Sequence, residues 1–298
     1  HERLVGSEMC IRDRLKAKLQ AYKESLSREE IDKLVADTKH LQEYQEEPSS
    51  QEDLEKIPML TREDISREIA PIYNEEMKIA EIPTVFHEIE TNGIGYLDLM
   101  FDLSDVPEKD LPMVGLLQAV LGIIDTEHYE YGELFNEINR HTGGIGTSLE
   151  LYPDVTKVKE KEFKATFEIK GKALYGQIPF AIRMMKEILT ASKLDDEKRL
   201  KEILSMTKTR LQDRFLSAGH SAAALRAMSY KSPISKFKDT TNGIEYYQNI
   251  REMEEHFDEK KEEIISGLKA LSELLFRKGN VMISYTAVSY THLTLPTT

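Results

Sequence analysis

The chain has 298 residues and a formal net charge of −13, with 40 Lys and Arg against 53 Asp and Glu. Nucleic-acid surfaces need clustered lysine and arginine, so this balance argues against one, and no run approaches the ~18 apolar residues of a membrane span. The single cysteine, Cys10, leaves no disulfide framework and favours a reducing compartment.

The two ends, 1–14 and 288–298, do not continue the patterns of their neighbours. Both resemble translated sequencing adapter, so we interpret them as artefacts and set them aside. We therefore expect that the natural protein continues in both directions and that this chain is a fragment. The alternative is a genuine disordered tail at each end.

Residues 15–50 have the pattern of two amphipathic helices, because apolar residues recur at spacings of three and four. Ser27-x-x-Glu30 is a capping box that begins the second helix. The short connection predicts a long antiparallel helical hairpin with one buried stripe.

Residues 51–83 are predicted to be a connector, because they contain three prolines and only isolated apolar anchors. We expect this connector to run over the domain surface with those anchors tucked in. The anchors are Leu54, Ile57 and Leu60.

The sheet is predicted to begin with a strand over 84–90, a hairpin turn at Asn92-Gly93 and a return strand over 94–103. Apolar and polar residues alternate in the return strand, which indicates a half-covered antiparallel sheet. Further alternation predicts strands over 145–151, 163–169 and 281–287, with a loop over 153–161.

Helical spacing of apolar residues fills most of the remaining chain. This order of strands and helices predicts an α+β domain over 84–287, with helices packed on one face of an antiparallel or mixed sheet. The predicted helices span 111–126, 129–140, 178–189, 195–215, 221–230 and 264–275.

The stretch 111–147 consists of an apolar helix, a polar connector, an amphipathic helix and a Gly-Gly turn before a strand. Together with TNGIGYLDLMFDL and HTGGI, this order resembles the core of pitrilysin/insulinase-type zinc metallopeptidases. In that family the first helix carries His-x-x-Glu-His. The wider sequence most resembles the presequence protease group, in the region where a helical hairpin leads into a third, non-catalytic domain.

The three motif positions fall on Leu116, Ala119 and Val120 when Asp125-Thr126 is aligned with the family's Gly-Thr. None of these side chains can ligate zinc or act as a general base. The sequence therefore predicts no catalytic, cofactor-binding or metal-binding residue in this chain, and a pitrilysin-like fold without its site.

Other residue types that carry chemistry have simpler interpretations as surface pairs, turns or helix ends. No histidine lies in a zinc motif, and His256-x-x-Glu259 lacks the second histidine that such a motif needs. The remaining groups are His87-Glu88, His128, His141, His220, Asp195-Asp196 and Glu254-Glu255.

The resemblance implies that the intact protein is a zinc metallopeptidase that degrades short unstructured peptides inside a closed chamber. Its partners would be the N-terminal catalytic half, which holds the zinc, and the C-terminal domain of the same polypeptide. This chain would supply the hinge hairpin and a non-catalytic wall. The alternative is an inactive scaffold subunit of a larger complex. We expect the bacterial cytoplasm, or alternatively the mitochondrial or plastid matrix.

Overall fold

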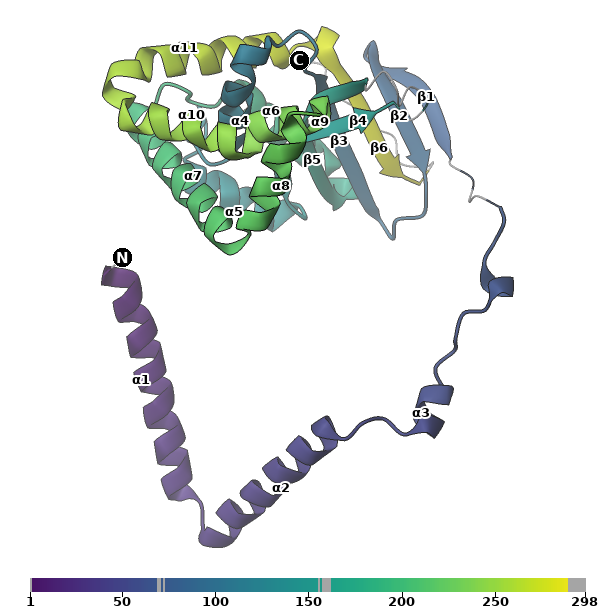
Figure 1. Ribbon diagram of the computed structural model, residues 1–298, viewed down its shortest axis with the longest axis vertical. Coiled ribbons are helices and arrows are strands. Elements are labelled where there is room, and N and C mark those ends of the chain that lie inside the picture. Colours follow the sequence, from purple (N-terminus) through teal and green to yellow (C-terminus); the bar gives the residue numbers. More distant parts are fainter. Residues whose placement is uncertain (1, 69–70, 72, 155, 157–161, 289–298) are drawn as a thin grey trace. The chain divides into compact units, whose positions relative to one another are not determined.

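The computed structural model describes residues 2–68, 71, 73–154, 156 and 162–288. The chain divides into two compact units, His1–Ala70 and Pro71–Thr298 (Figure 1). Most of the predicted loop over 153–161 and the segment 289–298 lie outside the described residues. Within the described part, no helix is long and apolar enough to cross a bilayer.

The first unit contains α1 (Glu2–Ser25), α2 (Arg28–Glu46), the short α3 (Gln51–Glu55) and a 3-10 turn at Arg62–Asp64. The predicted capping box is present, since Ser27 Oγ accepts from the Glu30 N–H at 3.3 Å and Glu30 Oε2 accepts from the Ser27 N–H at 2.8 Å. Helix α1 extends into residues 2–14, which the sequence led us to set aside.

Most apolar side chains described in this unit are exposed. Along α2, Leu34 and Leu41 are both more than half exposed, and none of the described residues of that helix is buried. The predicted anchors of the connector are exposed as well, at 46% for Leu54, 55% for Ile57 and 87% for Leu60.

The second unit is built on a six-stranded mixed sheet in the order β1-β2-β6-β3-β5-β4. Strands β2 and β6 are parallel, whereas the other neighbours are antiparallel. This α+β arrangement with a mixed sheet confirms the predicted fold class. The strands are β1 (Asn74–Ile79), β2 (Ile82–Glu88), β3 (Ile94–Asp102), β4 (Ile145–Pro153), β5 (Phe163–Leu174) and β6 (Val281–Ala287).

The predicted hairpin at Asn92-Gly93 is wrong. Both residues adopt positive φ, at 51° and 83°, so the chain does turn there. However, β6 lies between β2 and β3 and pairs with both of them. Strand β6 comes from the C-terminal part of the chain, so the sequence around the turn contains no signal that it pairs between β2 and β3.

The hairpin that the structure does contain joins β1 to β2. Its two turn residues, Ala80 and Glu81, have φ values of 52° and 67°, as a two-residue turn of the primed type requires. Strand β1 lies inside the predicted connector. It was missed because its NEEMKI sequence is charged and largely exposed, and because the turn lacks Asn and Gly.

Eight helices follow among the described residues of the second unit, on one face of the sheet (Figure 1). Helix α4 ends at Val120 rather than at the predicted residue 126, because Gly122 adopts a φ of +87°. Helices α9 and α10 were not predicted, and α11 begins at Phe257, before the predicted residue 264. The helices are α4 (Leu111–Val120), α5 (Tyr131–His141), α6 (Ile178–Thr190), α7 (Glu197–Ser217), α8 (Gly219–Ser229), α9 (Pro233–Asn242), α10 (Ile244–Glu255) and α11 (Phe257–Leu275).

The hydrophobic core is centred on α4, which contacts α7, α9, α10, α11 and β4. Leu116, Leu117 and Val120 are fully buried, in a helix whose sequence contains no charged residue. Strand β6, near the C-terminal end of the described residues, lies inside the sheet between β2 and β3. Val288, directly after this strand, is buried, and its N–H donates to Tyr175 Oη at 3.4 Å.

Candidate functional site

The three positions aligned with the zinc motif lie within the packed interior or at its border. Leu116 and Val120 have no exposed surface, and Ala119 is partly buried. A Cβ on Gly115 would lie 2.5 Å from the Thr241 carbonyl oxygen, so α9 packs directly against α4. These residues do not fit a zinc ion, because they offer no nitrogen, thiolate or carboxylate ligand.

The histidines are dispersed, and local contacts explain those that the sequence singled out on strands and helix ends. His128 Nδ1 lies 3.0 Å from Glu187 Oε2, and His87 bridges Asn74 Oδ1 at 2.6 Å and Ser284 Oγ at 3.1 Å. Across the described residues, no group of three His, Cys, Asp or Glu side chains is arranged to hold a metal ion.

The predicted pair His256 and Glu259 and one acid of the Asp195-Asp196 pair make surface contacts. His256 lies 3.7 Å from Glu259, and both side chains are more than half exposed. Asp195 accepts from Lys269 Nζ at 2.7 Å, again with both side chains largely exposed. Solvated pairs of this kind contribute little to stability and carry no indication of a substrate site.

A buried carboxylate lies on the sheet face opposite to the helices. Glu168 of β5 has no exposed surface. Its neighbours Phe167 and Ile169 point to the other face of the sheet, where they are part of the hydrophobic core. Its Oε1 accepts from Tyr152 Oη at 2.7 Å and from Thr166 Oγ1 at 2.5 Å. No pattern along the chain indicated this group, because a glutamate alternating with apolar residues is typical of any half-exposed strand.

Lys170 neutralises this carboxylate. Its Nζ lies 2.8 Å from Glu168 Oε2, 2.9 Å from Glu150 Oε1 and 3.8 Å from Asp98 Oδ2. We call these four residues, with Tyr152, the carboxylate cluster. They join β3, β5 and β4, the three strands at the β4 end of the sheet.

The cluster contains one carboxyl group that titrates near neutral pH. Burial, together with the negative charge of Glu168, raises the pKa of Asp98 to about 7. Burial also acts to raise the pKa of Glu168, but hydrogen bonds from Lys170, Thr166 and Tyr152 outweigh it and lower that pKa. Burial and the contact with Glu168 raise the pKa of Tyr152, so its phenol stays protonated. Near neutral pH the cluster can therefore take up or release one proton at Asp98, whereas the phenol of Tyr152 keeps its proton and is not an activated nucleophile.

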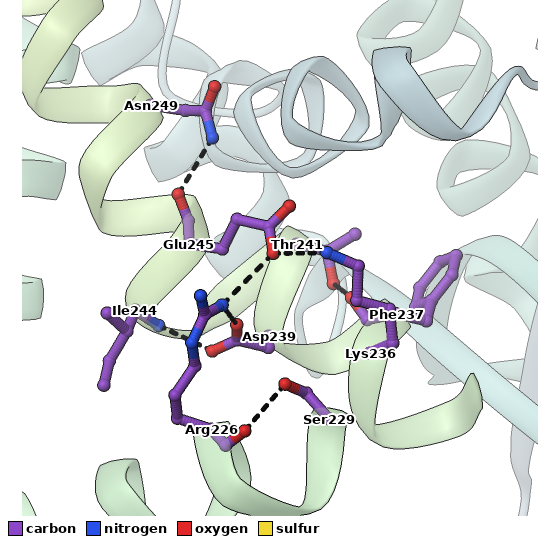
Figure 2. A network of polar contacts seen from close by, with 9 residues as sticks. All are labelled: Arg226, Ser229, Lys236, Phe237, Asp239, Thr241, Ile244, Glu245 and Asn249. Atoms are coloured by element: carbon purple, nitrogen blue, oxygen red, sulfur yellow. Dashed lines mark hydrogen bonds and ion pairs between the residues drawn. The ribbon is translucent and has the colours of Figure 1, made fainter. Parts of the chain in front are cut away.

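A second buried network joins α8, α9 and α10 (Figure 2). Arg226 Nη1 donates to Asp239 Oδ2 at 2.5 Å and lies 3.3 Å from Glu245 Oε2, which also accepts from Lys236 Nζ at 2.5 Å. Asp239 is fully buried, and its Oδ1 accepts from the Ile244 N–H at 2.9 Å. The network fixes the turn between α9 and α10 and has a structural role.

Comparison with known proteins places the chain among peptidase relatives. A family model described as associated with M16 peptidases of subfamily C matches residues 8–253. The chain is 36% identical over 271 residues to Protein HypA of Clostridium perfringens, covering 91% of this chain and 27% of that protein.

Two eukaryotic relatives are more distant. The chain is 26% identical over 270 residues to Presequence protease 1, chloroplastic/mitochondrial, of Arabidopsis thaliana, covering 90% of this chain and 25% of that protein. It is 26% identical over 214 residues to Presequence protease, mitochondrial, of Yarrowia lipolytica, covering 72% and 21%. The chain thus spans about a quarter of the length of these relatives.

Proposed function

This chain belongs to the family associated with M16 peptidases of subfamily C, and we propose that it forms the hinge hairpin and a non-catalytic wall of the peptide chamber in a larger zinc metallopeptidase. The named presequence protease relatives confirm the predicted resemblance. In this proposal the substrates are short unstructured peptides. The zinc and its His-x-x-Glu-His motif belong to an N-terminal half of the same polypeptide, and a C-terminal domain completes the chamber.

The state of α4 carries the proposal. The helix that would bear the motif is instead a packing element, with Leu116 and Val120 fully buried. Hydrolysis needs a metal-bound or base-activated water, and neither can be generated at apolar side chains. The chemistry therefore has to come from another part of the polypeptide, while this domain supplies walls and contacts.

The location we propose is the bacterial cytoplasm. The support is that the Clostridium perfringens relative is 36% identical, against 26% for the two eukaryotic relatives named for organelles.

The test compares this chain with a longer polypeptide that includes the N-terminal half. Both are dialysed, their zinc content is measured by elemental analysis, and each is incubated with an unstructured fluorogenic peptide. We expect the longer polypeptide to hold zinc and to cleave the peptide until a chelator is added, and this chain to do neither.

Two results would contradict the proposal in different ways. Stoichiometric zinc in this chain alone, with cleavage that a chelator abolishes, would show a catalytic site within it. A longer polypeptide that folds but neither binds zinc nor cleaves would instead favour the inactive scaffold subunit.

A further inference from the structure

A cavity of about 460 Å³ lies between strand β4 and helices α7, α8 and α9. Its walls are mainly apolar, formed by Leu149 and Leu151 of β4, Phe215 of α7, Leu225 of α8 and Phe237 of α9. Strand β4 is the last strand in the sheet order, so within the described part of the chain its outer edge has no neighbouring strand. An extended segment can therefore lie along that edge and place side chains in the cavity.

Among the described residues, the charged side chains that line this cavity are two cations, Arg214 and Lys238. This is unexpected in a chain of net charge −13, where Lys170, Lys208 and Arg226 all lie against carboxylates. Arg214 donates to the Asn242 side-chain oxygen at 3.0 Å and to the Asn242 carbonyl. Burial and the neighbouring charge of Arg210 lower the pKa of Arg214, as expected for a cation whose contacts are neutral oxygens.

The buried network of α8, α9 and α10 holds this cavity in shape. Phe237 lies on the same helix as Asp239 and points away from Arg226 in Figure 2. Because Asp239 is anchored to α8 and α10, the face of α9 that carries Phe237 and Lys238 is fixed relative to Leu225 of α8. The cavity is thus formed before a ligand arrives.

An apolar wall beside two cations selects a ligand whose carboxylate lies close to an apolar side chain. In an extended peptide, the side chain of a neighbouring residue points to the opposite face, so an acidic neighbour would point out of the cavity. A terminal carboxylate shares its Cα with the last side chain and can reach both features at once. Arginine binds such a carboxylate through paired N–H donors.

We propose that this cavity binds the C-terminal residue of an extended peptide, with its apolar side chain between Leu225 and Phe237 and its carboxylate at Arg214 and Lys238. The inference rests on the proposed role of this domain as a wall of a peptide chamber, and it names the part of the peptide that the wall recognises. It assigns a binding site, and no chemical step takes place there.

The test measures binding of a short, unstructured, fluorescein-labelled peptide ending in Leu to the whole chain by fluorescence anisotropy. The same peptide with a C-terminal amide lacks the negative charge but keeps the side chain, and a third peptide carries an internal Glu beside an amidated C-terminus. We expect the free acid to bind at least about tenfold more tightly than either amidated peptide, because each loses a charge-assisted contact.

Three variants locate the contact. Arg214→Gln should weaken binding of the free-acid peptide about tenfold, and Lys238→Gln should also weaken it. Both variants should leave binding of the amidated peptides unchanged. Lys238 is exposed, so its variant reports on binding even if Arg214→Gln disturbs folding through Asn242. Arg210→Gln is the matched control, because Arg210 lies one helical turn away and lines a different hollow.

Equal binding of free acid and amide, or equal weakening by Arg210→Gln and Arg214→Gln, would overturn the inference. Dimers that dissociate on Arg214→Gln, without peptide binding, would assign the cavity to a second copy of the chain and also overturn it. The outcome is independent of catalysis. If the longer polypeptide cleaves peptides but this chain shows no free-acid preference, only this inference fails. If the preference is found without any cleavage, the proposed function fails.

Discussion

Shortening one side chain at the centre of α4 tests whether this helix is the packing element that the structure shows. Leu117 is fully buried, and α4 is enclosed by α7, α9, α10 and α11. Leu117→Ala removes apolar contacts and leaves a cavity, which costs about 2–5 kcal/mol in comparable cores. We expect the upper half of that range, because helices on several sides limit how far the site can collapse.

The assay is urea unfolding followed by circular dichroism, with the midpoint and the slope compared between variant and parent. Leu216→Ala is the matched control, since Leu216 is also in a helix but is 86% exposed, and it should stay within about 0.5 kcal/mol of the parent. A Leu117→Ala variant that loses less than about 1 kcal/mol would refute the reasoning, because a fully enclosed leucine cannot be removed so cheaply.

Three further perturbations follow from the same structure. Placing His, Glu and His at the three motif positions should lower the melting temperature and create no tightly bound zinc. Two of those positions are fully buried, so an imidazole there would be enclosed by apolar side chains. A variant that is as stable as its parent and holds one zinc by elemental analysis would contradict this. Asp98 keeps its proton in the folded state up to about pH 7 but loses it near 3.8 when unfolded, so its contribution to the unfolding free energy falls as pH rises between those values. Asp98→Asn should flatten that fall by about 1–3 kcal/mol in urea titrations at several pH values, and an unchanged pH dependence would contradict this. Arg226→Ala leaves the fully buried Asp239 without its cation and should lower the unfolding free energy in urea by about 2–4 kcal/mol. The loss should lie in the lower part of the usual range because the Arg226 side chain is 32% exposed. The control is Arg183→Ala, which removes a cation over the Phe180 ring and should cost less than about 1 kcal/mol.

The elements that could be predicted from the sequence are those whose buried apolar residues recur at a fixed spacing. The apolar stripe of α6 and the alternation in β3 are local patterns, and both elements were found close to their predicted bounds. Strand β1 and helices α9 and α10 were missed because their signals are weak. β1 is charged and exposed, and α9 buries polar residues, including Asp239 and Thr240, that interrupt any apolar stripe.

Sheet order was beyond local reasoning. The turn at Asn92-Gly93 has the backbone of a tight turn, yet β6 separates the two strands that flank it. What places β6 there is its pairing on both sides, with Ile283 opposite Leu99 on β3 and beside Thr84 on β2. Residues so far apart in the chain cannot be matched by a pattern read along one sequence.

Both buried charge networks escaped prediction for a related reason. Glu168 looks like any polar residue of a half-covered strand until Tyr152 and Lys170 are seen to enclose it. Asp239 looks like a surface helix residue until Arg226 and the Ile244 N–H are seen to satisfy it. A carboxylate can be buried only where donors converge on it, and convergence is a property of the fold.

The packing around α4 bears on the proposal that this domain is a non-catalytic wall. A helix that carries His-x-x-Glu-His must leave room beside it for a metal, a water and a substrate. Here the neighbouring residue is Gly115, and a Cβ at that position would lie 2.5 Å from the Thr241 carbonyl oxygen and 2.7 Å from the Tyr246 ring. The glycine thus permits α9 and α10 to pack onto the helix. Because backbone atoms of α9 occupy that space, we expect that restoring the three motif side chains would not reopen a cleft beside the helix.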